Sequence, residues 1–272
     1  MHSMGQKQAG ASNEISPTHH NSLKSWSARH SDVTTMIKGK TEMRKFKTKE
    51  HTKPRCSVNK LGEYVAKQSS PARRREIIKT QKIPPTYNVV TYTPATREIV
   101  TSILTGFDEE HLIESIGDFF QKAEEADSEF DKRQAKCCHD ALRAFKKILP
   151  NLEAEDCTIL PGPQTWSIEI GGVTVSIRPE LLLEVDKGKS GFIKLYLSKS
   201  YRLDDHSAGV IAAVIAEKAI SAGMNISRRH IQIIDVFGQR IYKCPAHTKR
   251  LFREAEAACE EIAFNWRRFS AS

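Results

Sequence analysis

The segment that most limits the possible folds is residues 165–178, with the sequence TWSIEIGGVTVSIR. Apolar and polar residues alternate on both sides of Gly171-Gly172, which is typical of two antiparallel strands joined by a two-residue turn. The extended pattern continues beyond this segment, and residues 192–199 (FIKLYLSK) predict a third strand. Residues 231–244 predict one more hairpin. The chain is therefore expected to contain a sheet that is built from hairpins.

Helix start and stop signals surround these strands. Ser57 and Ser70 occupy capping positions, Pro71 stands at a first helical position, and Pro84-Pro85 ends the helix that Pro71 begins. Amphipathic spacing predicts further helices over residues 93–104, 108–126, 129–148, 208–220 and 246–266. The pattern predicts an α+β fold, in which a helical amino-terminal region precedes a mixed sheet of hairpins flanked by helices, with an αβββαβ-like core.

Charge divides the chain unevenly. The formal net charge is +9, and the first 60 residues contain 12 basic side chains against 4 acidic ones. The next 40 residues contain 7 basic side chains against 3 acidic ones, so the rest of the chain is slightly acidic. Residues 1–52 also lack any apolar periodicity. We therefore expect a disordered basic tail over residues 1–52, a helical basic region over 53–127 and an α+β domain over 128–272.

A run of cations in the basic region indicates an anionic partner. Arg73, Arg74 and Arg75 lie in the first turns of the helix that starts at Pro71, where the helix dipole disfavours positive charge. Together with Lys79 they are the predicted contacts to DNA or RNA phosphates. The alternative is internal pairing with an acidic stretch, which comprises Asp108, Glu109, Glu110 and Glu114.

Several classes of protein are not expected. No uncharged apolar run approaches 18 residues, so we expect no transmembrane helix and no membrane partner. The first ten residues lack the apolar region of a secretory signal, and the six cysteines form no C-x-x-C pair, so we expect a reducing, cytoplasmic setting. Nucleotide-binding, zinc-protease and serine-hydrolase motifs are absent from the sequence. Its aromatic residues are scattered and indicate no base-stacking platform.

The predicted order of elements over residues 129–237 is helix, three strands, helix, strand. Two charged residues in this range also have a distinctive spacing. Glu180 follows Pro179, and Lys194 comes 14 residues later on the next predicted strand. Order and spacing resemble the PD-(D/E)XK nuclease-like superfamily, so residues 128–272 resemble a nuclease-like domain. The resemblance implies that an acid on the second strand and an acid-x-lysine on the third bind Mg²⁺ or Mn²⁺. It makes Glu180 a catalytic residue and metal ligand, and Lys194 a catalytic residue.

The sequence departs from the superfamily pattern at one position, because Phe192 occupies the position of the second acid. Glu184 is expected on the same strand face as Glu180, and Glu217 in the following helix is the other possible metal ligand. Two functions stay open. One is a metal-dependent phosphodiesterase that hydrolyses nucleic acid, and the other is a non-catalytic nucleic-acid- or partner-binding protein on a degenerate nuclease-like fold.

The segment from Ser57 to Tyr92 (SVNKLGEYVAKQSSPARRREIIKTQKIPPTYNVVTY) provides a second resemblance. It is similar to the amino-terminal module of a family of uncharacterised bacterial proteins. This likeness implies a bacterial source and implies no activity.

Overall fold

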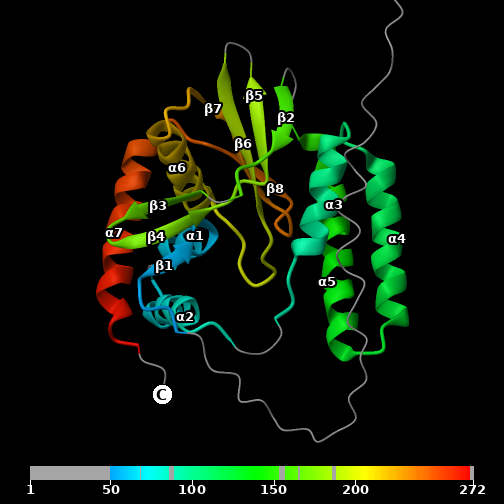
Figure 1. Cartoon of the computed structure of the whole chain (residues 1–272), viewed down its shortest axis with the longest axis horizontal. Helices are drawn as coiled ribbons and strands as arrows, with labels where there is room; N and C mark the ends of the chain where they lie inside the picture. Colours follow the sequence, from blue (N-terminus) through cyan, green and yellow to red (C-terminus); the bar gives the residue numbers. More distant parts are fainter. Residues whose placement is uncertain are drawn as a thin grey trace, which may run out of the picture. The chain divides into compact units, whose positions relative to one another are not determined.

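The computed structural model of the chain describes residues 50–67, 69–85, 89–152, 157–164, 166–185 and 188–269 (Figure 1). The basic tail predicted over residues 1–52 lies, up to residue 49, outside this range. All described residues belong to one compact unit that runs from Phe46 to Ser272.

A five-stranded mixed sheet forms the centre of this unit. Its strands are β2 (Cys157–Pro161), β5 (Leu181–Val185), β6 (Lys189–Tyr196), β7 (Ile226–Asp235) and β8 (Arg240–Lys243). They lie in the order β2-β5-β6-β7-β8, and only β6 and β7 run parallel. Helix α6 (Asp205–Ser221) connects these two parallel strands, as a crossover connection must.

The α+β fold class predicted from the sequence is confirmed. Helix α5 (Glu129–Lys146) precedes β2, so the sheet and its helices follow one another as α5, β2, β5, β6, α6 and β7. Within the large sheet this is helix, three strands, helix, strand, but the chain also forms two strands of a second sheet, Trp166–Ile170 and Val173–Ile177, between β2 and β5. The first strand of the large sheet is β2, which periodicity did not predict, because it is a short edge strand that ends in Pro161 and has no clear alternation of burial.

The hairpin predicted over residues 165–178 forms a separate small sheet. Strands β3 (Trp166–Ile170) and β4 (Val173–Ile177) are joined through Gly171 and Gly172, whose φ angles of +52° and +77° suit glycine. Strand β1 (Arg55–Ser57) pairs in parallel with β4, which gives the order β1-β4-β3. The extended run predicted to continue into Val185 is therefore divided between two sheets.

A tight corner over residues 178–180 makes this division. The Gly162 backbone N–H donates to the Glu180 carbonyl oxygen at 2.9 Å, and a Cβ on Gly162 would lie 2.1 Å from the Pro179 carbonyl oxygen. Only glycine allows so close an approach without movement of the backbone. Glu180 is thereby placed at the entrance to β5, beside the point where the chain leaves β4.

The large sheet separates two apolar clusters, and helices lie on both of its sides (Figure 1). One face packs against α1 (Val58–Ala66), α2 (Pro71–Lys82), α6, α7 (Thr248–Trp266) and the small sheet. The other face packs against α3 (Thr93–Leu104), α4 (Glu109–Glu125) and α5, and a short 3₁₀ turn spans Leu149–Asn151. Strand β6 contributes to both clusters, because successive side chains of a strand point to opposite faces of the sheet. Phe192 and Tyr196 belong to the first cluster, whereas Ile193 and Leu195 belong to the second.

The expected boundary between residues 127 and 128 does not separate two packed units. Helices α4 and α5 lie on either side of it and pack against each other, while β1 pairs with β4 and α1 packs on α6. The helices of the expected 53–127 region are therefore shared between the two faces of the sheet. Helical periodicity marks an apolar face but does not say which sheet face will cover it.

A buried lysine joins the two ends of the described unit. Lys82, 7% exposed, donates from Nζ to the Trp266 carbonyl oxygen at 3.0 Å and to the Phe269 carbonyl oxygen, and pairs with Glu50 at 3.1 Å. Trp266 in turn donates from Nε1 to the His51 carbonyl oxygen at 3.1 Å. The cation therefore lies at the carboxyl end of α7, where the helix dipole favours it.

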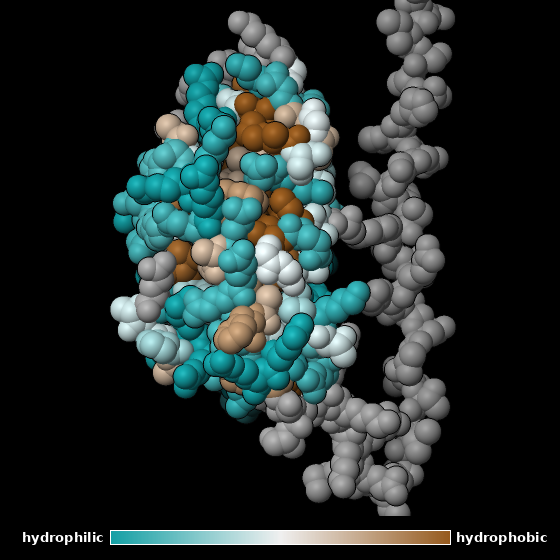
Figure 2. Space-filling model, turned by 90° about the vertical axis from the view of Figure 1, so that its left-hand side faces the viewer, coloured by the Kyte–Doolittle hydropathy of each residue, from teal (hydrophilic) through white to brown (hydrophobic). Residues whose placement is uncertain are grey.

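Figure 2 shows the side that carries α7 and the small sheet, where hydrophilic residues cover most of the surface and apolar residues form separate patches. None of the helices in the described part of the chain is both long enough and apolar enough to span a membrane.

Candidate functional site

Glu180, at the entrance to β5, lies opposite Lys194 of the adjacent strand β6. Leu181 is paired with Ile193 in the β5–β6 ladder, and the Glu180 backbone N–H donates to the Ile193 carbonyl oxygen at 2.9 Å. Lys194 Nζ donates to Glu180 Oε1 at 2.6 Å, and the side chains are only 9% and 15% exposed. Glu180 Oε2 accepts the Leu195 backbone N–H at 2.6 Å. The structure therefore brings together the two residues singled out by the family spacing, as a buried cross-strand ion pair.

Phe192 is fully buried in the first apolar cluster. Its ring centroid lies 5.2 Å from that of Trp166 at an interplanar angle of 58°. An acid at this position would have to give up its hydration to an apolar environment. Phe192, which stands where the superfamily pattern has an acid, is therefore part of the packed apolar core.

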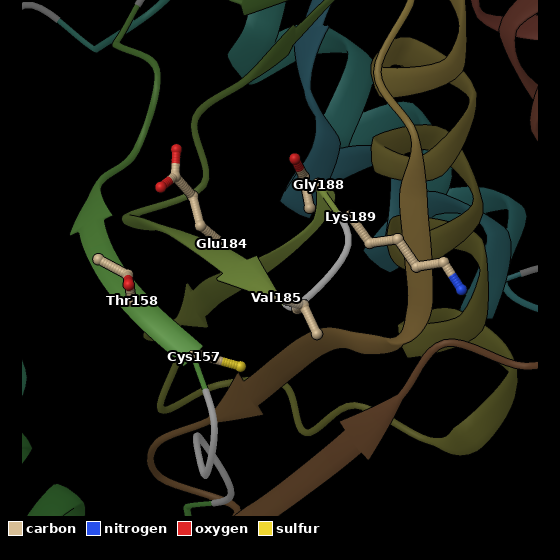
Figure 3. A pocket seen from close by; sticks show the side chains of 7 residues that line it. Cys157, Thr158, Glu184, Val185, Gly188 and Lys189 are labelled. Atoms are coloured by element: carbon tan, nitrogen blue, oxygen red, sulfur yellow. The ribbon is translucent and has the colours of Figure 1, made fainter.

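Glu184 and Glu217 do not form a common centre with Glu180. Glu184 lies four residues along β5 from Glu180, roughly 13 Å at the rise of an extended strand. It lines a hollow of about 610 Å³ at the far end of β2 and β5, where its side chain and that of Lys189 extend away from each other (Figure 3). Glu217 is half-buried near the end of α6.

The carboxylates that the structure describes do not fit a Mg²⁺ or Mn²⁺ ion. Such an ion takes several oxygen ligands, whereas Glu180 supplies one carboxylate whose two oxygens already bind Lys194 and a backbone N–H. Within the described ranges, no group of three or more His, Cys, Asp or Glu side chains is placed to hold a metal ion.

Sequence reasoning missed a second buried acid on the same sheet face. Glu63 of α1 is 8% exposed, and accepts from the Tyr196 hydroxyl at 2.9 Å and from Lys60 Nζ at 2.7 Å. Burial raises the pKa of Tyr196, so its hydroxyl stays protonated and donates to Glu63. The available signal was a charged residue amid buried neighbours of α1, Leu61 and Tyr64, but spacing alone could not identify Tyr196 as the partner.

Asp235 is a buried anchor. Its carboxylate accepts the backbone N–H groups of Leu203 at 2.9 Å and Gly238 at 2.8 Å. Burial raises the pKa of Asp235 despite these two bonds. The residue therefore holds the loop before α6 against the turn between β7 and β8.

The predicted basic helix α2 uses one of its arginines internally. Arg74 lies over the Tyr64 ring, 4.3 Å from its centroid, and pairs with Glu261 of α7. Arg73, Arg75 and Lys79 are exposed, and none of their side chains forms an ion pair or hydrogen bond with a described residue.

The acidic stretch does not neutralise these arginines. Asp108 caps α4 by accepting the His111 backbone N–H at 3.0 Å, and Glu109 pairs with Lys146 at 3.1 Å. Helix α4 packs over the opposite face of the large sheet from α2, so internal pairing of Arg74 uses a different acid from those predicted.

Arg178 lies where three adjoining hollows meet, and we call the surface they form the Arg178 groove. The Trp166 pocket, of about 490 Å³, lies against all three strands of the small sheet. A middle hollow of about 260 Å³ contains Lys194, and a third of about 470 Å³ contains Glu180 and residues of α3. The basic side chains that line the groove are Lys53, Arg55, Arg97, Arg178 and Lys194. Glu180 is the single carboxylate among the described residues that line it.

Comparison with known proteins adds no family to this description. No family model matches the chain, and no curated protein sequence matches it significantly.

Proposed function

We propose that this chain binds nucleic acid in the Arg178 groove and does not cleave it. The observation that carries the proposal is the charge of the groove, in which five cations line three adjoining hollows and the one carboxylate is neutralised by Lys194. A surface of this kind attracts a polyanion by neutralising phosphates and releasing their counterions.

Three arginines are the proposed phosphate contacts. The side chains of Arg55, Arg97 and Arg178 are exposed, and none of these side chains forms a hydrogen bond or ion pair with another residue that the structure describes. A guanidinium group binds a phosphate through two parallel N–H donors, so its planar geometry suits this task. Because the arginines line successive hollows, a ligand with repeating phosphates fits the groove better than a single small anion.

The order of the elements supports a relationship to the PD-(D/E)XK nuclease-like superfamily, and the site supports a non-catalytic branch of it. Phe192 fills the place of the second acid, and Glu180 is held in an ion pair. We also propose a cytoplasmic location, because all six cysteines are free thiols, as expected in a reducing compartment.

A metal-dependent phosphodiesterase is the second candidate. It is favoured by one observation, the contact between Glu180 and Lys194 on one face of the sheet, where the superfamily places an acid and a lysine. A working centre would require Mg²⁺ or Mn²⁺ ligands beyond the carboxylates described above.

Fluorescence anisotropy with labelled DNA and RNA oligonucleotides tests the proposal. The full chain should bind in the micromolar range or tighter at low salt, and replacing Arg55, Arg97 and Arg178 together with Gln should weaken binding at least tenfold. The slope of log K against log salt should fall by about 2, because each lost contact to single-stranded phosphates contributes about 0.7. Arg133→Gln on α5 is the matched control, since Arg133 is exposed and lines none of the three hollows.

The same oligonucleotides, incubated with Mn²⁺ or with EDTA, separate the two candidates. The proposal expects no cleavage in either condition. Mn²⁺-dependent cleavage that Lys194→Ala abolishes would establish the phosphodiesterase instead, and absence of binding in every form would reject both.

A further inference from the structure

The solvent-facing side of the small sheet carries serine residues side by side on all three strands. Ser57 of β1 is paired with Ser176 of β4, and Ser176 is paired with Ser167 of β3. Directly paired residues point to the same face of a sheet, so these three side chains form one line, which we call the serine row. Trp166 and Ile168 alternate with Ser167 along β3, and they point to the opposite face, where they pack on the first apolar cluster.

An arginine lies on each side of the serine row. Arg55 comes two residues before Ser57 on β1, and Arg178 comes two residues after Ser176, where β4 ends. Two residues of a strand span roughly 7 Å, and their side chains share a face. Arg55, Ser176 and Arg178 line both the Trp166 pocket and the middle hollow. The serine row therefore crosses the Arg178 groove between two guanidinium groups.

Two hydroxyl groups of the row are available to a ligand. Ser167 is exposed, and its side chain forms no hydrogen bond with a residue that the structure describes. Ser176 is only weakly engaged, since its hydroxyl lies 3.5 Å from the Cys56 carbonyl oxygen. The Ser57 hydroxyl instead accepts the Lys60 backbone N–H at 3.2 Å, so it serves as the cap of α1.

Hydroxyl groups between guanidinium groups match the backbone of RNA. Along a nucleic-acid strand a sugar lies between successive phosphates, so a strand whose phosphates contact Arg55 and Arg178 brings sugars to the serine row. A ribose has a 2′-hydroxyl that donates and accepts hydrogen bonds, as a serine hydroxyl does, whereas deoxyribose has neither function at this carbon. The available serines therefore gain hydrogen bonds with RNA that DNA does not offer.

We infer that the Arg178 groove binds RNA in preference to DNA, because Ser167 and Ser176 form hydrogen bonds with ribose 2′-hydroxyls of a strand whose phosphates bind the flanking arginines. This inference rests on the proposed function, and it specifies the class of nucleic acid and the residues that select it. Contacts to sugars and phosphates carry no direct information about sequence, so the preference applies to RNA of any sequence.

The test measures fluorescence anisotropy with labelled 20-nucleotide RNA and DNA strands of the same sequence at one salt concentration. Two neutral hydrogen bonds contribute roughly 5- to 100-fold in affinity, so RNA should bind at least fivefold more tightly than DNA. Replacing Ser167 and Ser176 together with Ala should remove this preference by weakening RNA binding, and should leave DNA binding within twofold of the unaltered value. Ser221→Ala is the matched control, because Ser221 is an exposed serine at the end of α6 that lines none of the three hollows.

A second arm uses the unaltered protein, so that no substitution can disturb the small sheet. Replacing each 2′-hydroxyl with fluorine keeps the ribose-like shape of the strand but removes the hydrogen-bond donor, so 2′-fluoro RNA should lose most of the advantage over DNA. Equal affinity for RNA and DNA, or 2′-fluoro RNA that binds as tightly as RNA, would overturn the inference while the proposed function stands. Failure to bind any oligonucleotide would overturn both.

Discussion

Two basic regions of the molecule are organised in opposite ways. On α2, Arg73, Arg74 and Arg75 are consecutive in the sequence, but successive residues of a helix point about 100° apart. Arg74 consequently packs inward, and its two neighbours point in other directions. In the Arg178 groove, Arg55 and Arg97 come from β1 and α3, far apart in the chain, and line the hollows that meet at Arg178. A run of charge in a sequence therefore does not by itself show which of its side chains pack inward and which face solvent.

The two regions also differ in what their cations do. Arg74 joins α2 to α7 through Glu261 and covers the Tyr64 ring, so its charge contributes to packing. Arg178 is exposed and has no partner among the described residues, so its charge faces solvent. We expect mutations in the first region to change stability and mutations in the second to change binding.

The largest expected effect comes from the one ion pair buried within the groove. Glu180→Gln leaves the Lys194 amine in a largely buried position without a counter-charge, and should lower the free energy of unfolding by about 2–4 kcal/mol. Urea denaturation followed by circular dichroism measures the change.

The double variant Glu180→Leu with Lys194→Met is the matched control, because it removes both charges together. It should recover most of the lost stability. If Glu180→Gln were as stable as the unaltered protein, the pair would have no structural role, and the phosphodiesterase candidate would gain support.

An intermediate effect is expected at Arg74. Arg74→Gln removes the pair with Glu261 and the contact with Tyr64, and should lower the free energy of unfolding by about 1–2 kcal/mol. The affinity for oligonucleotides should stay within twofold of the unaltered value. A stable protein with weakened binding would reverse the assignment and make Arg74 a nucleic-acid contact.

The smallest effect is expected from the exposed cations of α2. Replacing Arg73, Arg75 and Lys79 together with Gln should change the free energy of unfolding by less than about 0.5 kcal/mol, as is usual for exposed positions. The slope of log K against log salt should also change little, since none of the three lines the groove. A fall in that slope by about 2 would extend the interface onto α2, as the sequence first predicted.

Local signals predicted much of the fold. Gly171 and Gly172 make the turn that alternation in the sequence required, and Ser57 caps α1 by accepting the Lys60 backbone N–H at 3.2 Å. Periodicity did not predict that the chain changes sheet at Pro179, because alternation continues through the corner. The corner depends on Gly162, which approaches from another part of the chain.

The sequence could predict the part of the site that lies on a single pair of neighbouring strands, β5 and β6. The 14-residue spacing identified Glu180 and Lys194, which a single pair of strands brings into contact. The groove was not predictable, because Arg55 and Arg97 belong to elements whose positions depend on long-range packing. Glu63 was missed for the same reason, since its partner Tyr196 lies 133 residues away.

The lysine that joins the ends of the unit has a consequence for synthesis of the chain. Lys82 of α2 binds carbonyl oxygens at Trp266 and Phe269, so α2 gains these partners only after α7 has been made, whereas β1 and α1 find β4 and α6 earlier in synthesis. Contacts between such distant parts slow folding, because a long loop must close before they form. A ribosome-bound chain that stops before α7 should therefore leave Lys82 of α2 without its partners at the carboxyl end of α7.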